Sequence, residues 1–276
     1  MNVVWGLLII VGVAGVAIAA MLLVRRRAPE GSYFSDGDRA SGVFGVLATG
    51  LSILLGFIVF LAFTSYDRTR SGAETEATVL VQQVETALLL PSPASETLTG
   101  QLICYGRSVV NDEWERMRAG TMGNDISPWG VAMFSTLQTV HPTTASEQSA
   151  YDQWLAQTSE REQARLDRVH GASGVIPTPI WFVLFFVAAV VFVYMLFFAD
   201  PGEGAVTQAM LMGSVMAVIT SLLLLLVTLN RPLHSGVGGL EPVAMERSLD
   251  LVSRALAAVD GTVRVPCDPT GTKVGP

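Results

Sequence analysis

Four long stretches of this 276-residue chain contain no Asp, Glu, Lys, Arg or His, and they constrain its fold more than any other feature. They are residues 3–24, 43–64, 180–199 and 206–229, each 20 to 24 residues long. About 20 helical residues cross the roughly 30 Å hydrocarbon core of a bilayer. Because a backbone in lipid must satisfy its own hydrogen bonds, each stretch is predicted to be a transmembrane helix.

Two other readings of apolar stretches are disfavoured by composition and flanking charge. Only 15% of the residues are charged, against roughly 25% in soluble domains, so a soluble fold has too little polar surface to cover four such helices. A cleaved signal peptide has basic residues before its apolar core, whereas here Arg25, Arg26 and Arg27 follow the first stretch.

The chain is therefore predicted to be an all-α, polytopic membrane protein with four transmembrane helices in two pairs and a helical central domain between helices 2 and 3. Residues 1–64 hold the first pair and a short basic loop, residues 65–179 the extramembrane domain, and residues 180–229 the second pair. Residues 230–276 form an extramembrane tail with one amphipathic helix, 243–259, and a disordered end after Asp260.

Helical periodicity divides the central domain into four segments. The second transmembrane helix is expected to continue to Leu90, and further helices are expected at 95–119, 129–140 and 144–169. Leu98, Leu102, Tyr105, Val109 and Trp114 fall broadly along one side of the helix at 95–119.

The charged residues of these helices are interpreted as solvated. Arg161, Arg165 and Arg168 line up on the last helix, as surface charges commonly do, and Asp112, Glu113 and Glu115 share one helix turn. An alternative is that some of the arginines pair with Asp67, Glu74 or Glu76 on the extended second helix.

Small residues recur every four positions on two of the apolar stretches. Ala48, Ser52 and Gly56 do so on the second stretch, and Gly213, Ala217 and Ser221 on the fourth. This spacing lets helix backbones approach closely, so both faces are predicted to pack against other helices. The aromatic-rich third stretch is expected to face lipid.

Charge asymmetry predicts the orientation. Arg25, Arg26, Arg27 and Arg39 lie in the first short loop, which the positive-inside rule places in the cytoplasm. The N-terminus and the central domain are then extracytoplasmic, although arginines near the other helix ends favour the opposite topology. Cys104 and Cys267 fall on the same side either way, either as a disulfide or as two unrelated thiols.

Signals of catalysis, metal binding and cofactor binding are missing from the sequence. His141, His170 and His234 lack ligand-spaced partners, and no nucleotide-binding or hydrolase motif is present. The net charge of −7 disfavours nucleic acid as a partner. No ionisable residue lies within a predicted span, which is untypical of proton-coupled transporters. We therefore predict a non-enzymatic protein without a cofactor.

Short stretches distributed over nearly the whole chain resemble the bacterial bestrophin-like domain family, a family of unknown function. They include residues 44–47 and 74–80, Tyr105, residues 112–114, Arg161 with residues 165–166, and Arg231-Pro232 with Gly236. That family usually has an acidic residue where this chain has Asn230. Bestrophins are pentameric chloride channels with four transmembrane segments per subunit, so the resemblance implies an anion channel. They keep their large domain in the cytoplasm, which conflicts with the orientation predicted above.

The leading hypothesis is a homo-oligomeric anion channel in the bacterial cell membrane, with the second helix lining the axis. The candidate path comprises Ser52, Gly56, Phe57, Phe60 and Thr64, with Arg68 and Arg70 attracting anions at its mouth. The alternative is a membrane-anchored scaffold or envelope-sensing protein whose central domain binds a protein partner. The expected partners are the lipid bilayer and further copies of the chain.

Overall fold

The computed structural model describes residues 3–121, 126–172, 174–258 and 263–274, and these residues form helices and connecting turns without an extended strand. They divide into two compact units. Unit 1 holds the chain up to Ser65 together with residues 175–231 and 236–238. Unit 2 holds residues 66–174, 232–235 and the chain from Gly239 onwards.

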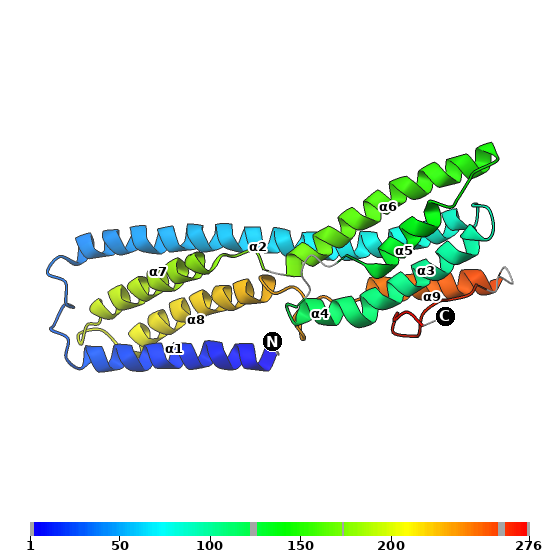
Figure 1. Cartoon of the computed structure of the whole chain (residues 1–276). Helices are drawn as coiled ribbons and strands as arrows, with labels where there is room; N and C mark the ends of the chain where they lie inside the picture. The colour runs from blue at the N-terminus through cyan, green and yellow to red at the C-terminus, as the bar shows by residue number, and fades with distance from the viewer. Residues whose placement is uncertain (1–2, 122–125, 173, 259–262, 275–276) are drawn as a thin grey trace. The chain divides into compact units, whose positions relative to one another are not determined.

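Unit 1 contains the four predicted transmembrane helices. They are α1 (Val3–Arg25), the first part of α2 (Gly37–Ala87), α7 (Thr178–Phe197) and α8 (Ala205–Leu229). All four are long and apolar enough to cross a membrane, which confirms the predicted fold class. In Figure 1, α1 lies along α8, and α7 lies between α8 and the first part of α2. Leu55, Leu184 and Leu226 join α2, α7 and α8 in a shared apolar core.

The two short connections of unit 1 meet at one end of its helices. The Arg25 guanidinium donates hydrogen bonds to the carbonyl oxygens of Asp200 and Pro201, both at 3.0 Å, and also to that of Glu203. The amide of Tyr33 donates to the carbonyl oxygen of Phe197 at 3.2 Å. The basic loop and the 198–204 hairpin therefore hold one another.

The aromatic residues of α7, which were expected to face lipid, differ in their surroundings along the helix. Phe182, Phe185 and Phe186 are 54–72% exposed. At the other end, Tyr194 stacks on Phe34 with ring centroids 5.2 Å apart, and this contact belongs to an aromatic cluster that also holds Phe44 and Phe198. The aromatic run of α7 therefore has an exposed part and a part that packs on the basic loop.

Unit 2 is built from the second part of α2 and the helices that pack on it. They are α3 (Ala94–Ser108), η1 (Val109–Glu113), α4 (Trp114–Arg118), α5 (Pro128–Leu137), α6 (Ala145–Ala172) and α9 (Val243–Ala258). Local signals fix the helix starts. Ser127 caps α5 by accepting from the amide of Gly130 at 3.4 Å, and Thr144 and Glu147 form a reciprocal capping box at the start of α6.

The single helix predicted at 95–119 is wrong in detail, because a π-helical turn interrupts it. Leu98, Leu102, Tyr105 and Val109 are buried at intervals of three and four residues, but the next buried aromatic, Trp114, follows five residues later. The π turn η1 absorbs the extra residue and keeps Trp114 on the buried side. It also turns Glu113 inward.

The predicted disordered end is wrong for residues 263–274, while residues 260–262 and 275–276 lie outside the described residues. Cys267 is disulfide-bonded to Cys104 of α3. Trp129 donates its indole N–H to the carbonyl oxygen of Gly271 at 2.8 Å, and a side chain at Gly271 would lie 2.3 Å from the amide nitrogen of Ser108. A covalent bond and close backbone packing thus order a segment whose composition is typical of disorder.

Candidate functional site on the two faces of α2

The transmembrane part of α2 has one packed face and one free face. Leu51, Leu55, Ile58 and Ala62 are at most 4% exposed and pack against α7 and α8. The opposite face carries Ser52, Gly56, Phe60 and Thr64 at four-residue intervals, and all four are exposed. A β-carbon added at Gly56 would meet no atom of the chain within 4 Å. This face is therefore available to lipid or to another copy of the chain.

The polar groups of the free face are bound to the helix itself. The Ser52 hydroxyl donates to the carbonyl oxygen of Ala48 at 2.9 Å, and the Thr64 hydroxyl donates to that of Phe60 at 2.8 Å. Such bonds satisfy hydroxyls inside a membrane while leaving their lone pairs outward. Phe57 and Phe60 are 61% and 63% exposed, so the face alternates hydroxyls with aromatic rings.

The two arginines predicted at the mouth differ in their surroundings. Arg70 forms an exposed ion pair with Glu74, with Nε and Oε1 2.9 Å apart, and this hydrogen bond raises the pKa of Arg70. Arg68 is exposed and has no acidic partner among the residues that the structure describes. Of the two, Arg68 is the uncompensated charge.

The small-residue ladder of α8 lies partly in an intrachain contact. A β-carbon at Gly213 would stand 2.9 Å from the Cδ1 of Ile18, so Gly213 lets α1 and α8 approach closely. Ala217 is half-buried, and the exposed Ser221 donates its hydroxyl to the carbonyl oxygen of Ala217 at 2.7 Å. The ladder of α2, in contrast, has no helix of its own chain against Gly56.

Beyond Ser65, the packed face of α2 meets α6 at two glycines. A β-carbon at Gly72 would lie 2.8 Å from the carbonyl oxygen of Ala164 and 2.9 Å from the amide nitrogen of Arg168. One at Gly171 would lie 1.5 Å from the Thr69 hydroxyl oxygen. Both helices therefore touch backbone to backbone, and this contact brings the arginines of α6 over Glu76, one turn after Gly72.

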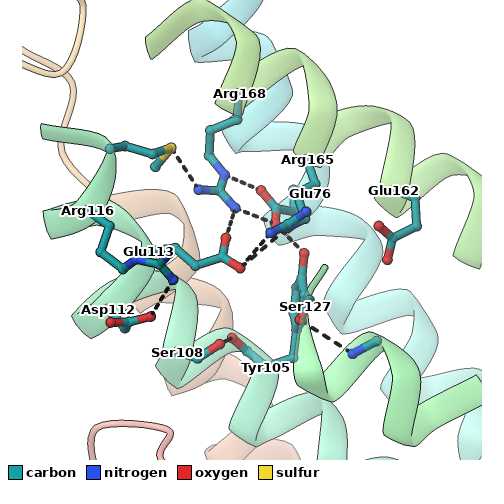
Figure 2. A network of polar contacts seen from close by, with 12 residues as sticks. Glu76, Tyr105, Ser108, Asp112, Glu113, Arg116, Ser127, Glu162, Arg165 and Arg168 are labelled. Carbon is teal, nitrogen blue, oxygen red and sulfur yellow. Dashed lines mark hydrogen bonds and ion pairs between the residues drawn. The ribbon is translucent and has the colours of Figure 1, made fainter. Parts of the chain in front are cut away.

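The result is a buried ion-pair network at the centre of unit 2 (Figure 2). Arg168, 0% exposed, binds both carboxylate oxygens of Glu76, through Nε at 2.5 Å and Nη2 at 2.9 Å. Its Nη2 also donates to Glu113 Oε2 at 2.7 Å, while Arg165 donates to Glu113 Oε1 at 3.0 Å. The Tyr105 hydroxyl completes the coordination of Glu76 at 2.5 Å.

Charge pairing outweighs burial in setting the protonation of this network. Burial alone would raise the pKa of Glu113, but the charges of Arg168 and Arg165 hold that pKa below its usual value. Burial alone would lower the pKa of Arg168, yet Glu76 and Glu113 raise it. Burial and the neighbouring Glu76 raise the pKa of Tyr105 well above its usual value, so its hydroxyl stays protonated and can donate.

Arg161 extends the network without a buried carboxylate of its own. Its guanidinium donates to Gln83 Oε1 at 2.6 Å and lies 4.9 Å from the centroid of the Tyr105 ring. Its acidic neighbour is Glu162, with Nη2 and Oε1 3.1 Å apart and the Glu162 side chain 43% exposed. Arg165 and Arg168 thus bind the two buried carboxylates, whereas Arg161 binds neither of them.

The interpretation of these arginines and of Glu113 as solvated was wrong, whereas the alternative pairing with Glu76 is present. Asp112 and Glu115 are exposed, as expected. Two signals in the sequence pointed to the network: a glycine inside an otherwise unbroken helix, and the five-residue step from Val109 to Trp114. Among the described residues, no group of three or more His, Cys, Asp or Glu side chains is placed to hold a metal ion.

The family model of the bestrophin-like domain matches residues 8–245, which is most of the chain. The chain belongs to the bestrophin-like family. No curated protein matches it.

Solved structures share the bestrophin-like fold at low sequence identity. A point mutant of a bacterial bestrophin homolog from Klebsiella pneumoniae is 15% identical, with 95% of this chain and 100% of that chain covered and a TM-score of 0.67. A second mutant of that homolog is also 15% identical, with 94% of this chain and 99% of that chain covered and a TM-score of 0.65. A structure described as a membrane protein variant gives 14% identity, 99% and 100% coverage and a TM-score of 0.66.

The stretches on which the bestrophin-like resemblance rests supply most of the buried network. Residues 74–80 carry Glu76, residues 112–114 carry Glu113, and residues 165–166 carry Arg165. Asn230 also has a structural role, because its side-chain oxygen accepts from the amides of Val175 and Ile176 at 2.9 and 3.0 Å. An acidic residue at this position would offer the same acceptor.

Proposed function

We propose that this bestrophin-like protein is a homo-oligomeric anion channel of the bacterial cell membrane, with the free face of α2 lining the central path. The observation that carries the proposal is the segregation of α2 into a face packed by Leu51 and Leu55 and a free face of hydroxyls and phenylalanines. Repetition of that face around an axis gives a pore without a buried charge.

Several features of the free face fit anion conduction. Rings of Phe57 and Phe60 provide a constriction of the kind that gates by dewetting. Arg68, without an acidic partner among the described residues, raises the local anion concentration at the helical turn after Thr64. The likeness to bacterial bestrophin homologs agrees with a channel architecture, although at 14–15% identity it shows the fold alone.

Chloride flux into liposomes containing the purified full-length protein tests the proposal. We expect Arg68→Ala to reduce the flux several-fold at low salt and less at high salt, because exposed charges are screened. Arg70→Ala should have a smaller effect, since Arg70 is already paired with Glu74. Arg247→Ala, which removes an exposed arginine of α9, is the matched control.

A size-reducing variant addresses the path itself. Phe60→Ala should increase the flux, because it widens the proposed constriction without touching the packed face of α2. A homogeneous, folded oligomer that carries no chloride would refute the channel and favour the scaffold alternative, in which the exposed Val131 and Phe134 of α5 belong to a partner-binding surface.

We further infer that the N-terminus and unit 2 are extracytoplasmic, against the bestrophin arrangement. The inference is supported by the Cys104–Cys267 disulfide, since disulfides persist in oxidising compartments and are rare in the cytoplasm. The loop with Arg25–27 and Arg39 is then cytoplasmic, as the positive-inside rule requires.

Cysteine accessibility in intact cells tests this orientation. Ser159→Cys places an exposed thiol on α6, and Ser35→Cys places one in the basic loop. A membrane-impermeant maleimide should label the Ser159→Cys protein directly and the Ser35→Cys protein only after permeabilisation. The reverse pattern would place unit 2 in the cytoplasm and overturn the inference.

A further inference from the structure

Unit 1 contains a cavity of about 410 Å³ between its helices, at the end that carries the basic loop. Each of the four helices contributes apolar side chains to its wall, among them Met21, Phe44, Met195, Leu211 and Met212. Cavities of this size between the helices of a bundle typically bind ligands through apolar walls and a few polar groups. Within a bilayer, the abundant group that fits such walls is an acyl chain.

One side of the cavity is polar. Gln208, 7% exposed, donates its side-chain amide to Glu203 Oε2 at 3.1 Å, and its side-chain oxygen has no hydrogen-bond partner. Buried polar atoms are normally satisfied by the protein, by water or by a ligand. A headgroup hydroxyl or amine that reached Gln208, with a small rotation of its side chain, would supply the missing donor.

The same end of unit 1 carries exposed arginines that form no ion pair with the carboxylates of the same connections, Glu30, Asp36, Asp38, Asp200 and Glu203. Arg26 and Arg27 directly follow Arg25, whose guanidinium is bound to the hairpin beside the cavity. Arg39 stands two residues before Ser41, which lines the cavity. Arg26, Arg27 and Arg39 are exposed and have no ion-pair partner among the described residues. Basic groups at the end of a transmembrane helix attract the phosphates of anionic lipids.

We propose that this cavity binds one anionic phospholipid. Its acyl chain lies between α1, α2, α7 and α8, its phosphate lies among Arg26, Arg27 and Arg39, and its headgroup donates a hydrogen bond to Gln208. Inorganic phosphate would leave the apolar walls unfilled, and a zwitterionic lipid would place the cation of its headgroup beside the three arginines. The proposal is independent of conduction, since none of these residues lies on the free face of α2.

Competition between two lipids with the same acyl chains tests the charge requirement. Full-length protein stripped of lipid is exchanged into micelles containing phosphatidylglycerol and phosphatidylcholine, and the lipid that stays bound is quantified by mass spectrometry. The native protein should retain phosphatidylglycerol selectively. Arg26→Ala/Arg27→Ala should lower this preference on the order of 30-fold, from about fivefold per basic residue near a lipid surface. The control, Arg247→Ala, should keep the preference. Equal retention of both lipids by the native protein would overturn the proposal.

The position of the acyl chain is tested on the native sequence, so that it does not depend on a core variant folding. Phosphatidylglycerol with a photoactivatable acyl chain should label Met21, Met195 or Met212. Val215→Trp, which fills the cavity, should abolish that labelling. Labelling confined to the outer surfaces of α1 and α7, or unchanged by Val215→Trp in folded protein, would show that the cavity holds no lipid.

Discussion

Arg168 is the central cation of unit 2, and replacing it tests whether the buried network stabilises the fold. Arg168→Met fills much of the same space but leaves Glu76 and Glu113 without the donors now at 2.5, 2.9 and 2.7 Å. Removing one partner of a fully buried ion pair costs about 3–5 kcal/mol, because the other charge stays buried and uncompensated. For a chain of this size, each kcal/mol of lost stability lowers the midpoint of thermal unfolding by roughly 2–4 °C, so Arg168→Met should lower it by about 6–20 °C.

Thermal unfolding of the full-length protein in detergent, followed by circular dichroism at the helical band, provides the measurement. The matched control is Arg254→Met on α9, which breaks the ion pair between Arg254 and Asp250. The side chains of Arg254 and Asp250 are 73% and 54% exposed. An exposed pair of this kind contributes about 0–1 kcal/mol, so the control midpoint should barely move.

A double variant separates the ion pair from the packing of the arginine. Glu76→Gln/Arg168→Met should be less destabilised than the sum of the two single variants, because one of the two carboxylates that Arg168 binds is then absent. Coupling energies of about 0.5–3 kcal/mol are usual for residues in direct contact. If Arg168→Met cost no more stability than Arg254→Met, or if the effects of Glu76→Gln and Arg168→Met simply added, the buried ion pairs would not stabilise unit 2.

Three further predictions follow from the packing and charges of individual residues. Gly72→Ala should destabilise the protein by about 1–3 kcal/mol in the same thermal assay, since the added β-carbon meets the backbone of α6. Gly50→Ala on the same helix is the control, because its β-carbon meets nothing within 4 Å, and it should be neutral or stabilising. The pKa of Glu113 is lower in the folded than in the unfolded state, so the stabilising contribution of Glu113 is complete above about pH 4.5 and is lost as the pH falls through the folded-state pKa. Midpoints of thermal unfolding measured at a series of pH values should show this loss. Glu113→Gln should make the midpoint less dependent on pH in this range. Asn230→Ala should cost about 1 kcal/mol by unfolding and Asn230→Asp much less, since only alanine leaves the amides of residues 175 and 176 without their acceptor; equal losses in both variants would refute that role.

The transmembrane part of the fold could be predicted because lipid is a simple solvent. Stretches without charge and of sufficient length must be helices there, so residues 3–24 and 206–229 were placed close to α1 and α8 without any knowledge of packing. Which face of each helix packs against the chain was harder to predict. Gly56 and Gly213 have the same small-residue spacing, yet only Gly213 touches a neighbouring helix of its own chain.

The core of unit 2 was mispredicted because burial of charge depends on distant segments. Arg165 and Arg168 on α6 look like a solvated face until Gly72 and Gly171 bring α6 against α2. Glu113 is turned inward by one extra residue in η1, and only the step from Val109 to Trp114 records that insertion in the sequence. The order of residues 263–274 depends on the disulfide between Cys267 and Cys104, which are 163 residues apart in the sequence, and the composition of this segment does not indicate that bond.

The two faces of α2 have separable consequences, and this separation makes the channel proposal testable. Glu76 and Gln83 lie on the packed face with side chains 0% exposed, so their replacement should lower stability first and alter flux only through loss of folded protein. Phe57 and Phe60 lie on the free face of the same helix and contact no core of their own chain, so their replacement should alter flux while the unfolding midpoint of the subunit hardly changes. A free-face variant that lowered subunit stability as much as Glu76→Gln would show that this face is packed within the chain and cannot line a path.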